Sequence, residues 1–156
     1  MNILLLGATG SIGDSVLSVI KENHSELNLF GITFHKNINK SQEIIKDFKP
    51  EFAYVEDRST FEDLKVTSDI TFLNGDSSLK ELIEHDDVDV IISAISGFAG
   101  LKATYLAAST GKKILLANKE SIVAGGDLIT ARAKKFNSKI IPIDSEHNAI
   151  FQCLSG

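Results

Sequence analysis

The chain contains almost no cysteine: Cys153 is the only one among its 156 residues. One thiol cannot close an internal disulfide, so the sequence suits a reducing compartment and predicts a cytoplasmic protein. No apolar run approaches the ~18 residues of a membrane span, and the N-terminus lacks the basic segment and cleavage site of a signal peptide. These absences argue against an exported protein and against a membrane partner.

An excess of positive charge is missing as well. The chain has sixteen Lys and Arg residues and twenty-one Asp and Glu residues, which gives a net charge of −5. This balance argues against a general nucleic-acid or anionic-membrane surface, so a phosphate-bearing ligand would need a local binding site. The 43% of hydrophobic residues and 24% of charged residues fit a soluble globular domain with a sizeable core.

The most informative stretch is NILLLGATGSIG at residues 2–13. Its apolar run, 3–6, is typical of a parallel strand covered on both faces. Three glycines follow at a spacing of three: Gly7, Gly10 and Gly13. Such glycines allow a sharp turn, close approach to a pyrophosphate and tight helix packing. Ser11 is expected to help cap a helix over 12–23, whose free N–H groups would face the phosphates. A purely structural strand-to-helix turn is the alternative, because GxxGxxG differs from the GxGxxG fingerprint.

The residues after the second predicted strand, 27–34, bear on the type of dinucleotide. An NAD site usually has a carboxylate here for the ribose 2′-hydroxyl. This chain instead continues with His35, Lys36 and Asn37. A lysine charge and an amide donor suit a 2′-phosphate, so NADP is favoured over NAD. The alternative for Lys36 is an ordinary solvated turn lysine.

Strand and helix patterns alternate along the rest of the chain. Further strands are predicted at 52–55, 70–73, 88–95, 113–117 and 139–143, and helices at 38–49, 57–65, 77–85, 101–109 and 118–136. Asp76 is expected to cap the helix that follows it. The small-residue turn at 96–100 is expected to border the nicotinamide. The alternation predicts an α/β fold: a Rossmann-like, doubly wound, mostly parallel sheet with helices on both faces.

Such a sheet binds ligands at the carboxyl ends of its strands, where three polar clusters are expected: 7–13, 118–121 and 144–147. Asp144 and Glu146 follow a buried strand, and oxygen-rich sets of this kind suit Mg²⁺ or Mn²⁺. A simple cap for a helix over 148–154 explains Asp144 equally well. Asn118 reads as a helix cap, but the cation of Lys119 opposes the helix dipole in the first turn, so an anionic ligand would explain it.

Three motifs together resemble one family: GATGSIG at the start, ILLANKESIV at 114–123 and IPIDSEHNAIFQ at 141–152. They look like 1-deoxy-D-xylulose 5-phosphate reductoisomerase, an NADPH- and divalent-metal-dependent enzyme of non-mevalonate isoprenoid biosynthesis. The resemblance covers the whole chain, which matches only the N-terminal part of the family. It implies an NADP-binding domain at 1–143 and the start of a catalytic domain at 144–156.

The resemblance also implies residue roles. Cofactor-binding positions are Gly7, Thr9, Gly10, Ser11, Ile12, Gly13, Lys36, Asn37, Asn118 and Glu120; catalytic positions are Lys119 and Glu146; substrate contacts are Lys119, Ser145 and Glu146; and metal ligands are Asp144 and Glu146. His35 departs from the pattern, because the family often has a small residue there.

The implied reaction converts 1-deoxy-D-xylulose 5-phosphate, a small phosphorylated sugar, into 2-C-methyl-D-erythritol 4-phosphate. The resemblance implies a homodimeric full-length enzyme with Mg²⁺ or Mn²⁺, and a chain that is inactive alone. One alternative is another NADP-linked reductase, such as a semialdehyde dehydrogenase, which would need a nucleophilic cysteine; Cys153 is the sole candidate. The other alternative is a stand-alone NADP-binding module without chemistry.

Overall fold

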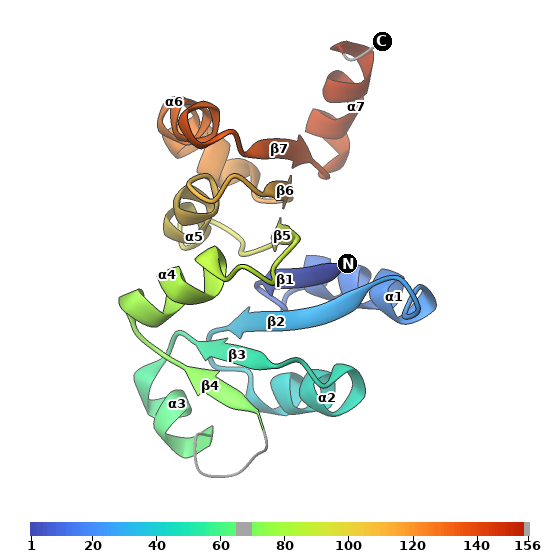
Figure 1. Ribbon diagram of the computed structural model, residues 1–156, viewed down its shortest axis with the longest axis vertical. Helices are drawn as coiled ribbons and strands as arrows, with labels where there is room; N and C mark the ends of the chain where they lie inside the picture. Colours follow the sequence, from blue (N-terminus) through green and yellow to red (C-terminus); the bar gives the residue numbers. More distant parts are fainter. Residues whose placement is uncertain (65–69, 155–156) are drawn as a thin grey trace.

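The computed structural model describes residues 1–64 and 70–154. Its strands form one seven-stranded sheet, in the order β4-β3-β2-β1-β5-β6-β7 (Figure 1). Their bounds are β1 (Asn2–Leu6), β2 (Asn28–Phe34), β3 (Phe52–Val55), β4 (Thr71–Leu73), β5 (Val90–Ser93), β6 (Lys113–Leu116) and β7 (Lys139–Pro142). All neighbouring strands pair in parallel, which confirms the predicted doubly wound sheet.

The order of the strands reverses next to β1. From β1 in the middle of the sheet the chain builds outward to β4, then returns to place β5 on the other side of β1 (Figure 1). The loops that follow β1 and β5 therefore leave in opposite directions, and in open α/β sheets ligands bind in the crevice at this point.

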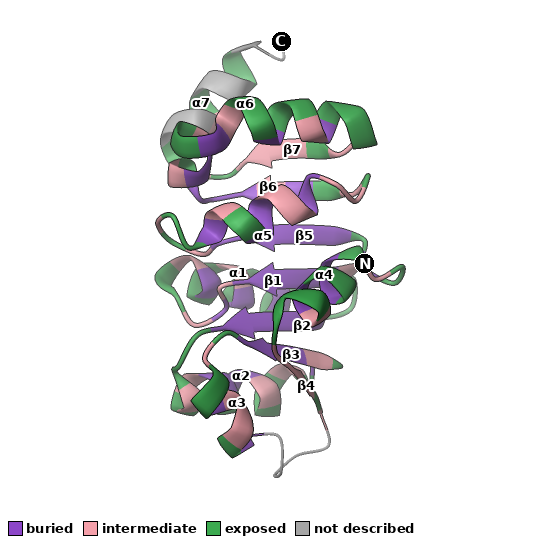
Figure 2. Cartoon of the chain, turned by 90° about the vertical axis from the view of Figure 1, so that its left-hand side faces the viewer, coloured by how far each residue is buried: buried purple, intermediate pink, exposed green. Residues whose placement is uncertain are grey.

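Helices cover both faces of the sheet. They are α1 (Ser11–Glu22), α2 (Ile38–Phe48), α3 (Arg58–Leu64), α4 (Asp76–Glu84), α5 (Gly100–Ala107), α6 (Lys119–Phe136) and α7 (Ser145–Leu154). Buried side chains of α1, α2 and α3 share one core cluster, and those of α4, α5 and α6 share the other. Figure 2 looks onto the face that α4, α5 and α6 cover.

The first strand lies between the two clusters. Leu5 packs into the first cluster, whereas Leu4 and Leu6 pack into the second, and all three are fully buried. The sequence predicted that β1 is covered on both faces, and this burial explains why its apolar run is continuous. The central strands are uniformly buried in Figure 2, while β7 at the edge is only partly so.

The predicted helix caps have mixed outcomes. Asn118 does cap α6, because its Oδ1 accepts the Ser121 N–H at 2.8 Å. Ser11 does not cap α1: the helix begins at Ser11 itself, with Gly10 at the N-cap and no side-chain cap bond. Asp76 likewise is the first residue of α4 behind Gly75. Both predictions are wrong because each helix starts one residue earlier than expected. Ser11 and Asp76 therefore lie inside the first turn, where a side chain does not act as the N-cap.

Across 1–64 and 70–154, none of the helices combines the length and the apolar character that crossing a bilayer requires.

Candidate functional site

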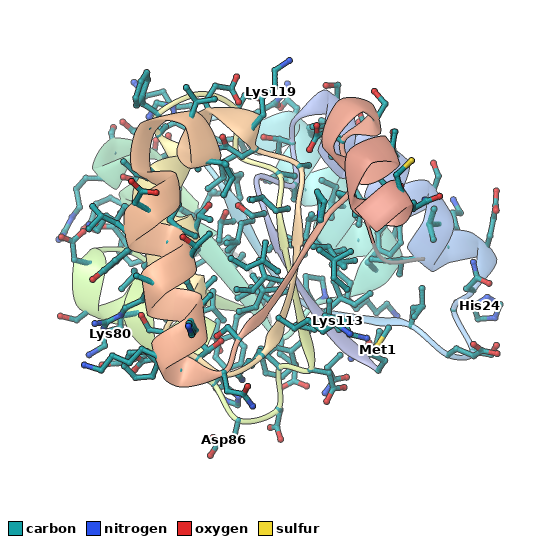
Figure 3. The ribbon with its side chains drawn as sticks, turned by 90° about the horizontal axis from the view of Figure 1, so that it is seen from above. Met1, His24, Lys80, Asp86, Lys113 and Lys119 are labelled. Atoms are coloured by element: carbon teal, nitrogen blue, oxygen red, sulfur yellow. The ribbon has the colours of Figure 1, made fainter. Side chains whose placement is uncertain are left out.

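The candidate site lies at the carboxyl edge of the sheet, where the strand order reverses. In Figure 3 the labelled residue Lys119, the first of α6, marks this edge. Asp86, in the connection between α4 and β5, marks the opposite edge. The loop after β1, the loop after β5 and the start of α6 converge here. The structure therefore brings together the polar clusters at 7–13 and 118–121.

The three glycines of the first loop differ in whether the fold requires a glycine at their position. Gly7 has a φ of +88°, and a Cβ there would lie 2.8 Å from the Ala94 carbonyl oxygen. A Cβ on Gly13 would lie 2.3 Å from the Ala8 carbonyl oxygen, so this glycine is required for α1 to pack against the end of β1. Gly10 has no such constraint, because its Cβ would meet nothing closer than 3.5 Å.

Gly10 is therefore dispensable for the fold but lies where a ligand would come closest to the backbone. It is the N-cap of α1, and the first N–H groups of a helix have no partner within the helix. Those groups, with the positive end of the helix dipole, form an anion-binding surface. The free N–H groups at the start of α1 could therefore bind a pyrophosphate.

A cavity of about 470 Å³ opens beside the loop. Its walls come from the glycine loop, the ends of β2 and β3, and α4 and α5: Gly7, Thr9, Gly10, His35, Tyr54, Glu56, Leu79 and Ala103. Most of these walls are apolar, and the pKa of the buried Tyr54 phenol is raised above its usual range by desolvation and by nearby Glu56, so the phenol stays neutral. A flat heterocycle with a polar edge fits such a space.

A second cavity, of about 220 Å³, shares a wall with the first. Both are lined by Ala94, Ile95 and Ser96, the residues that follow β5. The second cavity is also lined by Ile12, Lys119, Glu120 and Asp144. The two cavities therefore lie next to each other at the carboxyl edge, and we call the pair the crevice. Together their walls extend from the end of β3, past the glycine loop, to the start of α6 and the end of β7.

The predicted turn at 96–100 is held by Asn118. This residue is 2% exposed, and its Nδ2 donates to the carbonyl oxygens of Ile95 and, at 3.0 Å, Gly97. Because Oδ1 caps α6, the amide ties the β5–α5 turn to the start of α6. Gly100 must be a glycine beside it, since a Cβ there would overlap the amide nitrogen.

The residues after β2 lie at the rim of the first cavity. His35 lines it, and Lys36 is the next residue. Asn37 caps α2 through Oδ1, which accepts the Lys40 N–H at 3.2 Å. The Lys36 ammonium lies 3.4 Å from an oxygen of Asp57, a residue just after β3 that sequence reasoning did not consider. The sequence does hold a signal for Asp57: like Lys36, it follows a predicted strand, which places it at the same carboxyl edge of the sheet.

The proposed metal residues are only partly described. Asp144 lines the second cavity and is half-buried, and Ser145 is the first residue of α7. The side chains of Glu146 and His147 lie outside the described residues. Of the predicted pair, only the Asp144 carboxylate therefore belongs to the described side chains. Among those side chains, no cluster of three or more His, Cys, Asp or Glu residues is suited to a metal ion.

Lys119 and Cys153 differ in their relation to the crevice. Lys119 is exposed, lines the second cavity and forms no ion pair with a described residue. Cys153 is exposed on α7 and lines neither of the two cavities. The alternative of a cysteine-dependent reductase therefore has no support from the position of this thiol.

Comparisons with known proteins agree with this geometry. The family model for 1-deoxy-D-xylulose 5-phosphate reductoisomerase matches residues 3–126. A curated relative of that name from Francisella tularensis subsp. novicida (strain U112) is 49% identical over 153 residues, which are 97% of this chain and 40% of the relative. The chain thus spans about 40% of the length of this relative.

Solved structures give the same result. A crystal structure of DOX-P reductoisomerase in complex with NADPH, fosmidomycin and magnesium matches with a TM-score of 0.91 and 40% identity, over 98% of this chain and 38% of that one. The Zymomonas mobilis enzyme in complex with NADPH matches with a TM-score of 0.90 and 37% identity, over 97% and 41% of the two chains. The chain belongs to the 1-deoxy-D-xylulose 5-phosphate reductoisomerase family.

Proposed function

We propose that the chain is the NADPH-binding part of a 1-deoxy-D-xylulose 5-phosphate reductoisomerase, with the dinucleotide domain at 1–143 and the start of the catalytic domain at 144–156. The observation that carries the proposal is the pair of neighbouring cavities that share the residues after β5 and together border the glycine loop and the ends of β2 and β7. Solved relatives in complex with NADPH support it.

We assign a part of the dinucleotide to each cavity. The adenosine half occupies the larger cavity, between the glycine loop and the apolar residues of α4 and α5. The pyrophosphate lies on the loop, against Thr9, Gly10, Ser11 and Ile12. Lys36 and Asn37 hold the 2′-phosphate, and the nicotinamide extends past Ser96 toward Glu120. Asn118 acts by positioning, because its amide holds the turn after β5.

The substrate and metal roles belong to the second cavity. Asp144 and Glu146 would hold Mg²⁺ or Mn²⁺, and Lys119, Ser145 and Glu146 would contact the phosphorylated sugar. When bound, NADPH supplies the reducing equivalent and the divalent cation supplies Lewis acidity for the rearrangement. The exposed Lys119 ammonium would neutralise negative charge on the substrate. We extend the proposal to a cytoplasmic, homodimeric whole protein that makes 2-C-methyl-D-erythritol 4-phosphate.

Ala99→Trp tests where the nucleotide lies. Ala99 is exposed, precedes α5 with helical backbone angles and lines the larger cavity, so an indole would fill the space assigned to adenosine without a clash in the core. We expect NADPH affinity to fall about tenfold, within the 1–3 kcal/mol that overpacking usually costs, at unchanged thermal stability. The exposed Ala124 of α6 provides the control, Ala124→Trp. Equal NADPH affinity of both variants and the parent, measured by calorimetry, would place the adenosine elsewhere.

Asp144→Asn tests the metal assignment. With few protein oxygens the Mn²⁺ site of this chain is expected to be weak, and loss of one carboxylate charge should weaken it further by about tenfold. NADPH affinity should stay the same, because the cofactor phosphates lie at the first loop. Electron paramagnetic resonance of free Mn²⁺ measures the binding, and Asp127→Asn on the exposed face of α6 is the matched control. If both variants bind Mn²⁺ alike, Asp144 is a structural residue of α7 and no metal ligand.

A further inference from the structure

The Lys36 ammonium has a partner in the free protein. Its Nζ lies 3.4 Å from Oδ2 of Asp57, and the lysine side chain is 63% exposed while the aspartate is 23% exposed. The residues that precede them, His35 and Glu56, both line the larger cavity. The pair therefore bridges the ends of β2 and β3 at the rim of the nucleotide site.

Asp57 is held firmly on its own strand end. Its Oδ1 accepts the backbone N–H of Thr60 at 3.0 Å and the Thr60 hydroxyl at 2.9 Å, which fixes the carboxylate at the start of α3. These two bonds, followed by the attraction of Lys36, keep the pKa of Asp57 below its ordinary value, so the group is ionised at neutral pH. The carboxylate is fixed, whereas the lysine side chain is long and mostly exposed.

We propose that Asp57 is a specificity-determining residue that competes with the 2′-phosphate of NADP for the Lys36 ammonium. The inference rests on the proposed NADPH site. A carboxylate and a phosphate that share the one ammonium repel each other, so the Lys36–Asp57 pair weakens the hold of Lys36 on the 2′-phosphate of NADPH. NADH has no 2′-phosphate and leaves the pair intact. Asp57 thereby reduces the preference for NADPH that Lys36 creates.

Asp57→Asn separates the charge from the structural role. The asparagine keeps an oxygen for the two Thr60 bonds but loses the charge that holds Lys36. Because exposed ion pairs are weak, we expect NADPH to bind about two- to fivefold more tightly and NADH to be unaffected. Asp47→Asn is the control for loss of one negative charge, since Asp47 on α2 forms an exposed ion pair with Lys21 on α1 at 3.8 Å. Thermal melts verify that α3 stays folded.

The double variant tests the competition itself. In a Lys36→Met background there is no ammonium to release, so Asp57→Asn should change NADPH affinity no more than Asp47→Asn does. The inference is overturned if Asp57→Asn fails to tighten NADPH binding, or if its gain persists in the Lys36→Met background, which would indicate general charge repulsion. If Lys36→Met itself leaves NADPH affinity unchanged, the proposed 2′-phosphate site fails instead, so the two failures are distinguishable.

Discussion

Gly13→Ala should reduce the free energy of unfolding by about 3 kcal/mol, the upper part of the range for overpacking. The added Cβ would lie 2.3 Å from the Ala8 carbonyl oxygen and 2.7 Å from its carbonyl carbon. Both are backbone atoms, so α1 must move away from the end of β1 to make room. That movement would open the core between α1 and the sheet, where Leu17 and Ile20 are buried. Urea unfolding followed by circular dichroism measures the loss.

Gly10→Ala is the matched variant three residues earlier in the same loop. Its Cβ would meet nothing closer than 3.5 Å, and its φ of −84° suits any residue, so the free energy of unfolding should stay within about 0.5 kcal/mol of the parent. NADPH affinity should nevertheless fall about tenfold or more, because the methyl group occupies the backbone approach of the pyrophosphate. Unchanged binding by Gly10→Ala would make the loop a structural turn only.

Lys36→Met should weaken NADPH binding by about one to two decades, because a charge-assisted contact contributes roughly 1.5–3 kcal/mol. The affinity for NADH should not change, since NADH lacks the group that Lys36 would hold. Lys21→Met removes the same charge from α1 at an exposed ion pair and provides the control. Calorimetric titration of both nucleotides separates a specific contact from a general loss of positive charge. Parallel losses for NADPH and NADH would contradict the assignment.

The fold could be predicted because burial on both faces leaves a direct trace in the sequence. The unbroken apolar run of β1 has no polar alternation, and the structure buries Leu4 and Leu6 on one face and Leu5 on the other. The strand ends were less certain: β5 runs over Val90–Ser93 rather than the predicted 88–95. Residues flanking a parallel strand continue to be apolar where they enter or leave the core, so hydrophobicity alone does not define where pairing stops.

The sequence predicted local features of the site and, from the order of strands and helices, the edge of the sheet where its segments meet, but not the side-chain contacts between those segments. The turn at Gly7, the close packing at Gly13 and the cap of α6 by Asn118 depend on local geometry, and all three are as expected. The Lys36 to Asp57 pair is different, because it depends on the register of β2 beside β3, which brings two strand ends together across 21 positions of the chain. The side-chain contacts of Asn118 with Ile95 and Gly97 are equally non-local.

The central claim is that the crevice is an NADPH site that distinguishes the 2′-phosphate. Titration of the 156-residue chain with NADPH and with NADH, by calorimetry under identical salt conditions, tests it most directly. We predict one NADPH per chain, bound at least about tenfold more tightly than NADH, a difference of about 1.4 kcal/mol. Equal affinity for the two nucleotides, or no binding of NADPH, would contradict the account.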